Sequence, residues 1–343
     1  MSHSRTSEAP TSSENQEARL TTDYKFGVRN FLILASLKGV GFETMNKIAG
    51  SDVSFQAISE SLDSFEMAEV IRGFGAHSVA NNAEDWKRQV DLAITDAEKI
   101  ERNFIDRGID IIWKGSEQYP TQLLDLPDPP KWLFVEGNKE VLNAESIGVV
   151  GTRKPSAYGL WLTHYVGFSL ADWGMPTVSG LAAGIDQEIH LSSLRANIET
   201  IAFLGTGILS DYPKGSELIR RHIVENGGAI ATEYLPKDSY SAKNFVRRNR
   251  LQAALSQTLI PVEWSLKSGT AHTVNYAFRL RRKIAVIRVR EQPDFSWIPA
   301  DLRVGVDEFV VPAEHDRLSE FVFKKQLTKV KKQESQFRLF EDY

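Results

Sequence analysis

From Ser146 onward, short apolar runs alternate with segments of helical periodicity, and this alternation constrains the fold more than any other feature. The runs are SIGVVG (146–151), PTVSG (176–180), TIAFLG (200–205), AIAT (229–232), TLIPVE (258–263) and KIAVIRV (283–289). Continuous apolar strands of this kind are buried on both faces, as in a parallel sheet covered by helices. The pattern predicts an α/β fold with a doubly wound, mostly parallel, Rossmann-like sheet.

Four segments are predicted along the chain. Residues 1–22 are rich in Ser, Thr and Glu and lack a secretory apolar stretch, which indicates a disordered leader. Residues 23–107 resemble a small all-α module of the SAM-like or helix-hairpin-helix type, ending in a long amphipathic linker helix over 83–107. Residues 108–312 form the sheet domain, and residues 313–343 form a basic tail or a short final helix.

The glycine pair in Lys38-Gly39-Val40-Gly41 permits a tight turn between two helices of the N-terminal module. Such a hairpin can hold a nucleic-acid phosphate on its backbone amides, or it can be purely structural. Both interpretations stay open from the sequence.

Composition excludes several classes of protein. The chain contains no cysteine, and therefore no disulfide, thiolate metal site or cysteine nucleophile. No apolar run approaches the roughly 20 residues of a membrane helix. We expect a cytoplasmic protein without a membrane partner.

Charge is distributed unevenly along the chain, whose formal net charge is -4. Residues 151–290 hold 18 Lys and Arg against 10 Asp and Glu. These cations cluster in KNFVRRNR (243–250) and in RLRRKIAVIRVR (279–290). The sequence therefore predicts an anionic partner for the sheet domain.

Glycine and hydroxyl residues follow the predicted strands in the turns GTRKPS (151–156), SGLAAGID (179–186), GTG (205–207) and EWSLKSGT (263–270). Ligands of open parallel sheets bind beyond the carboxyl ends of the strands. Such turns let an anion approach backbone amides, so together they predict a phosphate-binding rim. Taken singly, each glycine has an equally simple structural interpretation.

Familiar catalytic patterns are missing. The sequence has neither a Gly-x-Gly-x-x-Gly after the first strand nor a Gly-x-x-x-x-Gly-Lys-Ser/Thr loop, so neither an NAD-dependent dehydrogenase nor an ATPase is expected. His190 and His272 lack ligand-spaced partners, and structural or surface roles are favoured for both. Asp186 is interpreted as a helix cap or as a ligand for a hydroxyl. Glu233 and Glu263 are the rim carboxylates that could form an acid/base pair.

The segment 243–250 points to a nucleic acid. If it opens a helix, its arginines crowd the first turns, where the helix dipole disfavours cations and an anion would compensate. Phe245 among them offers a stacking face for an unpaired base. The alternative is a solvated basic face with a core phenylalanine.

Taken in order, these motifs resemble the DprA/Smf family of DNA-processing proteins. The resemblance runs from Ile109 to Val289 through DIIWKGSEQYPTQLLDLPDPPKWLFVEGN, GTRKPSAYG, SGLAAGIDQEIH, LGTGILSDYP, FVRRNRLQAALS and VEWSLKSGT. It implies a homodimer that binds and protects single-stranded DNA and helps load a RecA-type recombinase in natural transformation. It implies no catalysis, cofactor or metal.

The resemblance also implies a set of site residues. The positions assigned to DNA binding are Arg153, Lys154, Lys243, Phe245, Arg247, Arg248, Asn249 and Arg250. The positions assigned to the turns that shape the pocket are Gly151, Thr152, Ser179, Gly180, Gly184, Asp186, Gly205, Gly207, Glu263, Lys267, Ser268, Gly269 and Thr270.

The chain departs from the family pattern in places. Arg290-Glu291-Gln292-Pro293 replaces a Pro-Gly loop, Trp264 is bulkier than the usual residue, and the ending lacks a winged-helix pattern. A divergent role in a mobile element or in defence therefore stays open. The alternative function is a nucleotide sensor or a hydrolase similar to the LOG phosphoribohydrolases, with Glu263 and 268–270 at its site.

Overall fold

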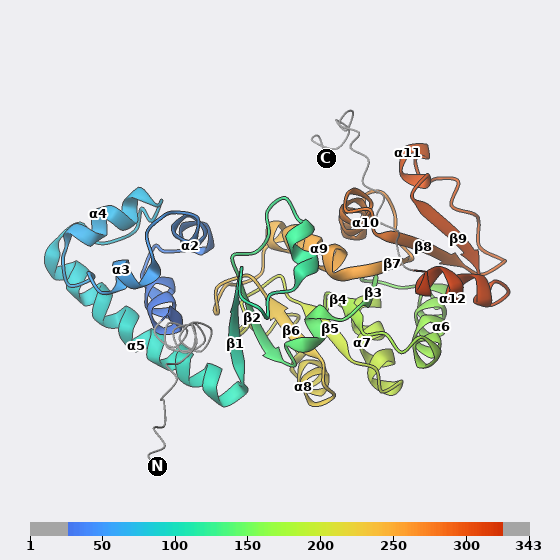
Figure 1. The fold of residues 1–343 in the computed structure, drawn as a ribbon, viewed down its shortest axis with the longest axis horizontal. Helices are drawn as coiled ribbons and strands as arrows, with labels where there is room; N and C mark the ends of the chain where they lie inside the picture. Colours follow the sequence, from blue (N-terminus) through green and yellow to red (C-terminus); the bar gives the residue numbers. More distant parts are fainter. Residues whose placement is uncertain (1–26, 325–343) are drawn as a thin grey trace, which may run out of the picture.

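The computed structural model describes residues 27–324, so the leader and residues 325–343 lie outside the described part of the chain. Residues 27–36 are helical and are followed by α2 (Phe42–Ala49), α3 (Phe55–Ser59), α4 (Glu66–Gly73) and α5 (Ala83–Arg107). Figure 1 shows these helices as a module at one end of the molecule, with α5 running toward β1.

The long helix over 83–107 is confirmed, and local chemistry sets both of its ends. The side chain of Asn82 accepts a hydrogen bond from the amide of Asp85 at 2.9 Å, which caps the first turn. Gly108 ends the helix in the left-handed conformation at φ 63°.

Nine strands form one sheet in the order β1-β2-β6-β5-β4-β3-β7-β8-β9. Their bounds are β1 (Ile109–Trp113), β2 (Trp132–Gly137), β3 (Ser146–Gly151), β4 (Thr177–Ser179), β5 (Thr200–Phe203), β6 (Ala229–Thr232), β7 (Ser256–Val262), β8 (Lys283–Arg288) and β9 (Val306–Val310). Strand β2 pairs antiparallel with β1 and β6, and all other pairs are parallel. The predicted fold class is confirmed.

Helices cover both faces of the sheet. The helices α6 (Ala157–Trp173), α7 (Ile185–Arg195) and α8 (Glu217–Glu225) lie on one face, and α9 (Ala242–Leu255) and α10 (Gly269–Arg279) lie on the other. The short helical turns η1 (Thr121–Asp125), η2 (Glu140–Asn143) and α11 (Ala300–Arg303) lie in connections. Within residues 27–324 no helix combines the length and apolarity needed to cross a membrane.

The end of the sheet domain differs from the prediction. Strand β9 extends the sheet beside β8, and α12 (His315–Phe323) buries Leu318 and Val322 in the core that α6 and α7 share. Of the two alternatives predicted for 313–343, a basic tail or a short final helix, the described residues 315–323 form the helix, and it packs into the core of the sheet domain. Strand β9 escaped prediction because its sequence VDEFV is partly polar, as an edge strand with exposed positions permits.

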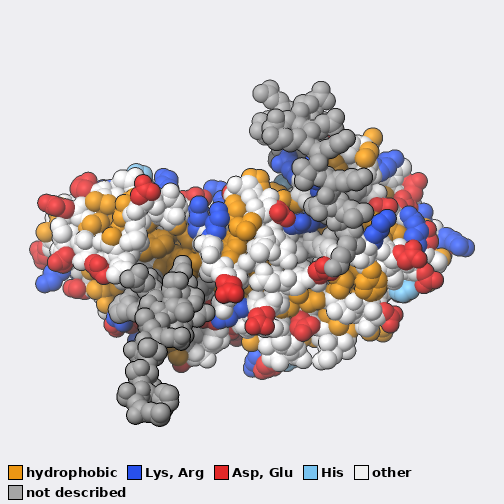
Figure 2. All heavy atoms as spheres, in the orientation of Figure 1, with side chains coloured by type: hydrophobic (Ala, Val, Ile, Leu, Met, Phe, Trp, Pro, Cys, Tyr) orange, Lys and Arg blue, Asp and Glu red, His pale blue; other side chains and the backbone are white. Residues whose placement is uncertain are grey.

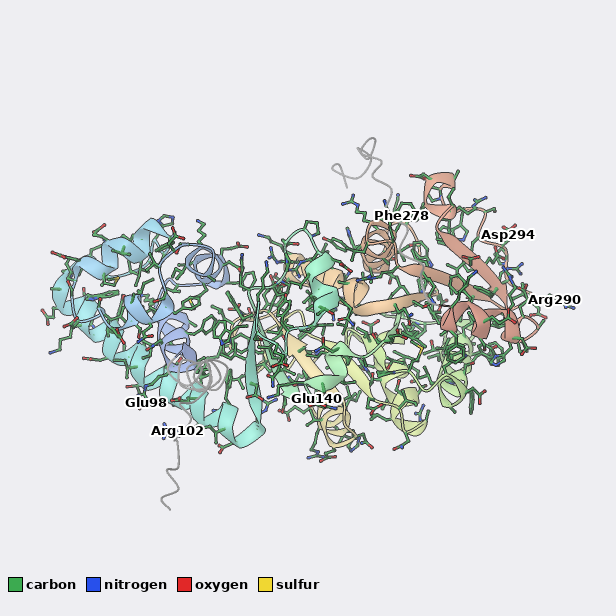
Figure 3. The ribbon with its side chains drawn as sticks, viewed as in Figure 1. Glu98, Arg102, Glu140, Phe278, Arg290 and Asp294 are labelled. Atoms are coloured by element: carbon green, nitrogen blue, oxygen red, sulfur yellow. The ribbon has the colours of Figure 1, made fainter. Side chains whose placement is uncertain are left out.

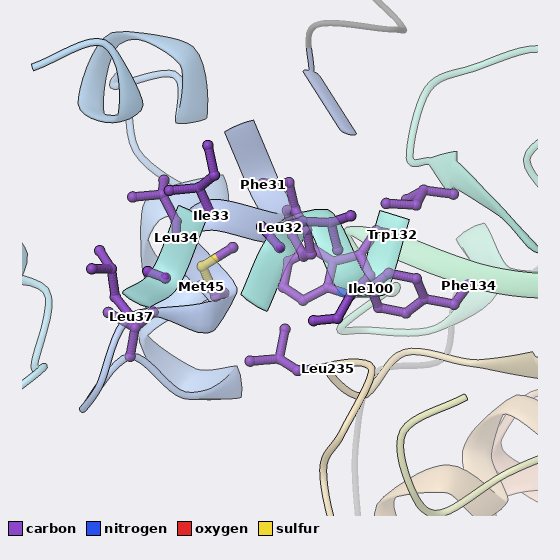
Figure 4. Close-up of a cluster of buried hydrophobic side chains, with 14 of the residues drawn as sticks. Phe31, Leu32, Ile33, Leu34, Leu37, Met45, Ile100, Trp132, Phe134 and Leu235 are labelled. Carbon is purple, nitrogen blue, oxygen red and sulfur yellow. The ribbon is translucent and has the colours of Figure 1, made fainter. Parts of the chain in front are cut away.

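The helical module and the sheet share one hydrophobic core, which joins the two segments that the sequence separates at residue 107. Figure 4 shows Phe31 beside Trp132 and Phe134 of β2. The Phe31 ring lies 5.0 Å from the Trp132 ring and 5.8 Å from the Phe134 ring, both edge-on. Alternate residues of β2, Leu133 and Val135, enter the core on the opposite face, as the two-residue period of a strand requires.

Because of this shared core, we predict that Phe31→Ala lowers the free energy of unfolding by about 3–5 kcal/mol. Urea titration followed by tryptophan fluorescence should show a single transition for the variant and for the parent chain. Phe168→Ala is the control, since that side chain is 82% exposed and its loss should be nearly neutral. Two separate transitions, with only the first affected, would contradict a common core.

Candidate nucleic-acid interface

A cavity of about 620 Å³ opens beyond the carboxyl end of β3. Strand β3 lies between β4 and β7, and the chain continues from β3 into α6 on one face of the sheet, whereas α9 and α10 cover the other face. The order of the strands therefore reverses at β3. Open parallel sheets bind their ligands at such a reversal point. Ten predicted site residues line the cavity: Gly151, Thr152, Arg153, Asp186, Phe245, Arg248, Asn249, Ser268, Gly269 and Thr270.

Arg248 forms the floor of the cavity. Its side chain is buried, and Nη1 donates hydrogen bonds to the carbonyl oxygens of Gly180, at 2.7 Å, and Phe203. Burial lowers the pKa of Arg248 to about 10, while the Asp186 carboxylate opposes that shift. The guanidinium thus joins the ends of β4 and β5 to α9.

Asp186 lies beside Arg248 in the first turn of α7 and is also buried. Burial raises the pKa of its carboxyl group, and the charge of Arg248 and hydrogen bonds from the Gly151 and Ala182 backbone act against that rise. These internal partners favour a role in fixing the cavity floor over a role as a catalytic acid.

An aromatic group forms one wall of the cavity. Phe245 lies 5.3 Å from the ring of Tyr212, which stacks on Tyr240 at 4.6 Å. The exposed guanidinium of Arg153 lies 5.3 Å from the centre of the Phe245 ring. The two tyrosines were missed, although Tyr212 is the penultimate residue of the motif LGTGILSDYP, five residues after the rim turn 205–207.

A smaller cavity of about 170 Å³ adjoins the first, and Phe245, Tyr212 and Arg153 line both. Gly180 and Gly205 line this smaller cavity. A Cβ on Gly180 would lie 2.2 Å from Nη1 of Arg248, and a Cβ on Gly205 would lie 2.4 Å from the Phe245 ring. These two glycines therefore make room for the protein's own side chains, where the sequence indicated room for an anion.

The segment 243–250 lies in helix α9, and its side chains lie in two different environments. Phe245, Arg248, Asn249 and Gln252 line the cavity, which matches the spacing of one helical face. The amide of Asn249 donates to the carbonyl oxygen of Gly269 at 3.0 Å, which ties α9 to the start of α10.

The other cations of α9 face internal partners. Arg250 is buried, and its Nη1 and Nη2 each donate to the Glu233 carboxylate at 2.7 Å. Arg247 lies 3.3 Å from an Asp128 oxygen and 5.2 Å from the centre of the Phe42 ring. Neither arginine lines the cavity, so the cations of this segment do not all face it.

Lys243, Lys154 and Lys267 are exposed and lie outside the cavity lining. Lys243 pairs with Glu43 of α2 at 3.7 Å. Figure 2 shows basic side chains gathered where the helical module meets the sheet domain, with acidic groups interspersed over the rest of that view. These lysines surround the site and do not form its floor.

The remaining predicted residues have local structural partners. The Ser179 hydroxyl donates to the carbonyl oxygen of Val149 at 2.7 Å. Gly207 packs against the backbone of 235–236, and Gly184 adopts φ 86° before α7. Glu263 accepts a hydrogen bond from the Ser156 amide at 2.8 Å, at the start of α6.

Glu263 and Glu233 therefore have separate partners and do not form an acid/base pair within the described residues. That part of the chain also holds no group of three or more His, Cys, Asp or Glu side chains placed to bind a metal.

Three of the six cations in the second basic cluster, 279–290, have internal partners, and the other three are exposed. Arg282 donates to Asp125 at 2.7 Å and Arg288 to Glu308 at 2.5 Å. The Lys283 ammonium donates to the carbonyl oxygens of Phe321 and Val322 at the end of α12, and burial lowers its pKa to about 8. Much of the positive charge that the sequence shows is therefore not available to a ligand.

We predict that Arg250→Ala lowers the free energy of unfolding by about 3–5 kcal/mol, because it leaves the buried Glu233 carboxylate without its partner. Thermal and urea unfolding would measure the loss. Arg153→Ala is the matched control, since the exposed Arg153 side chain should change stability by less than about 0.5 kcal/mol. Equal stability of the two variants would contradict the structural role of Arg250.

His190 gives a pH-dependent prediction. Burial, with the charge of Arg248 adding to it, lowers the pKa of His190 from 6.5 to about 3. Between these values the unfolded chain binds a proton that the folded chain does not, so the free energy of unfolding falls as pH falls, by up to about 1.4 kcal/mol per pH unit. His190→Asn should flatten this slope between pH 6.5 and about 5 in urea titrations. An unchanged slope would contradict a neutral buried imidazole.

Comparison with known proteins shows which family the chain resembles. The model of the family described as DNA recombination-mediator protein A matches residues 110–296, more than half of the chain. Protein Smf of Escherichia coli is 37% identical over 174 residues, covering 51% of this chain and 46% of its own length. The DNA processing protein DprA of Bacillus subtilis is 32% identical over 183 residues, covering 53% and 61%. The match thus spans about half the length of these relatives.

Two solved structures share the fold. DNA processing protein A of Streptococcus pneumoniae superposes over 86% of this chain and 99% of its own, with a TM-score of 0.60 and 24% identity. DNA processing protein A of Helicobacter pylori, whose single-stranded DNA binding mode was determined, covers 61% and 95% with a TM-score of 0.53 and 25% identity.

Proposed function

The chain belongs to the DNA recombination-mediator protein A family, and from this premise we propose that it binds single-stranded DNA in the 620 Å³ cavity. The observation that carries the proposal is the wall formed by Phe245 with the Arg153 guanidinium 5.3 Å from its centre. An aromatic face beside an exposed cation is the combination that holds a base and its phosphate.

The cavity favours an unpaired strand over a duplex. The Phe245 ring forms a wall of the cavity, so only a base that is free of its complement can stack on it. Tyr212 and Tyr240 continue the aromatic wall and offer faces to neighbouring bases. Gly269, where an added Cβ would meet no atom within 4 Å, leaves its backbone open to a phosphate at the start of α10.

The same geometry supports binding without catalysis. The ionisable groups beneath the cavity, Asp186 and Arg248, are turned toward each other and toward the backbone. Glu263, on which the nucleotide-hydrolase alternative depends, directly follows β7. Its carboxylate accepts a hydrogen bond from the Ser156 amide at the start of α6, and Glu263 does not line the cavity. We therefore prefer a DNA-binding protein to an enzyme acting on a small nucleotide.

We further propose that the bound strand is protected and passed to a RecA-type recombinase during natural transformation, and that the protein acts as a homodimer. The support is the family's description as a recombination mediator and the DNA-processing names of the relatives. Recombinase exchange assays with DNA coated by a single-strand binding protein would test this step.

We predict that Arg153→Ala and Phe245→Ala each weaken oligo-dT binding several-fold. Loss of the Arg153 contact should also reduce the magnitude of the slope of log affinity against log salt by about 0.7, because one phosphate fewer is neutralised and fewer counterions are released on binding. Phe245→Ala should leave that slope unchanged, since stacking involves no counterion release. Fluorescence anisotropy at several salt concentrations measures both quantities.

Arg195→Ala is the control for these variants, because Arg195 is an exposed arginine at the far end of α7 and pairs with Glu188. It should bind as the parent chain does. If Arg153→Ala and Phe245→Ala also bind as the parent does, the cavity is not the binding site.

A further inference from the structure

A second aromatic surface lies outside the cavity, and we call it the Trp297 platform. It consists of Trp264, Leu266, Phe295 and Trp297. The Trp297 ring lies 4.9 Å from that of Trp264 and 5.9 Å from that of Phe295, both edge-on. Trp297 is 39% exposed and Leu266 is 45% exposed, so this apolar surface faces solvent. Several aromatic and aliphatic side chains in contact at the surface form an apolar patch of the kind that can bind a ligand.

The loop that carries Trp297 is held in place on both sides. The Arg303 guanidinium donates hydrogen bonds to the carbonyl oxygens of Ser296 and Ile298, the latter at 2.7 Å. The Asp294 carboxylate accepts a hydrogen bond from the Ser296 amide at 3.1 Å, and Ile298 is buried. The indole is therefore fixed before any ligand arrives, which reduces the entropy that binding would cost.

The platform and the cavity lie at the same edge of the sheet. Leu266 follows β7 and Trp297 follows β8, and β7 pairs in parallel with both β3 and β8, so these loops leave the carboxyl ends of neighbouring strands. Figure 3 labels Asp294, from the loop of Trp297, at the end of the molecule far from the helical module.

The wall between the two sites is continuous. Trp264 packs in one apolar cluster with Val150 and Ala271, and Val150 lines the cavity. The segment 265–268 leads from the platform to Ser268 on the cavity rim, and Lys267 within it is exposed. A strand leaving the cavity in this direction meets a cation and then an aromatic face.

We propose that single-stranded DNA seated in the cavity continues over residues 265–268 and stacks an unpaired base on Trp297. This inference rests on the proposed function. The platform's continuity with the cavity favours a nucleic acid strand over a docked protein.

The test compares a short oligo-dT of about four nucleotides with one of about twelve, using the full chain and anisotropy. Trp297→Ala should bind the short strand as the parent does and should bind the long strand at least about fivefold more weakly. Trp297→Phe should recover most of the lost affinity, because it restores a stacking face. Phe168→Ala, which removes an exposed aromatic ring from the middle of α6, is the control and should change neither affinity.

Equal binding of the long strand by Trp297→Ala and the parent would overturn the inference and leave the proposed function intact. Equal weakening at both lengths would also overturn it, because the effect would then come through the cavity or the fold. If the parent chain binds neither strand, the proposed function itself fails and this inference fails with it.

Discussion

The buried guanidinium of Arg248 is the interaction on which the rest of the site depends. A buried charge is costly unless it is paired and hydrogen-bonded, and here two strand-end carbonyls and the Asp186 carboxylate supply those partners. Because the carbonyls belong to Gly180 and Phe203, the guanidinium fixes β4 and β5 against α9. The cavity above it therefore has a rigid floor, and the groups on its walls keep their positions.

Helix α9 combines two roles through its periodicity. One face places Phe245, Asn249 and Gln252 along the cavity, and another sends Arg250 to the buried Glu233 carboxylate. Positive charge in this helix is thus mostly structural, and the ligand contacts that we propose are made by Arg153 and by aromatic rings. The same helix that forms the proposed binding site also secures the sheet, which couples binding to stability.

Much of the fold was accessible from the sequence. The buried strands and the helix over 83–107 have strong local patterns, and they form as predicted. Strand β9 does not follow a continuous apolar run, and the shared core around Phe31 depends on contacts between distant segments. Neither could be derived from periodicity.

The site was predicted in location more than in detail. Strand ends identified the edge of the sheet at which the cavity lies, because topology alone brings them together. Individual roles depend on which way a side chain points: Gly205 makes room for Phe245, and Arg250 turns to Glu233. Tyr240 lines the cavity because the loop before α9 passes beside it, and no motif in the sequence specifies the path of that loop.

A crystal structure of the protein with bound oligo-dT tests the central claim most directly. The account predicts a phosphate within hydrogen-bond distance of the Arg153 guanidinium and a base stacked on Phe245, with Arg248 still bound to the carbonyl oxygens of Gly180 and Phe203. A strand bound at the opposite edge of the sheet, or an Arg248 that leaves those carbonyls to hold a phosphate, would contradict it.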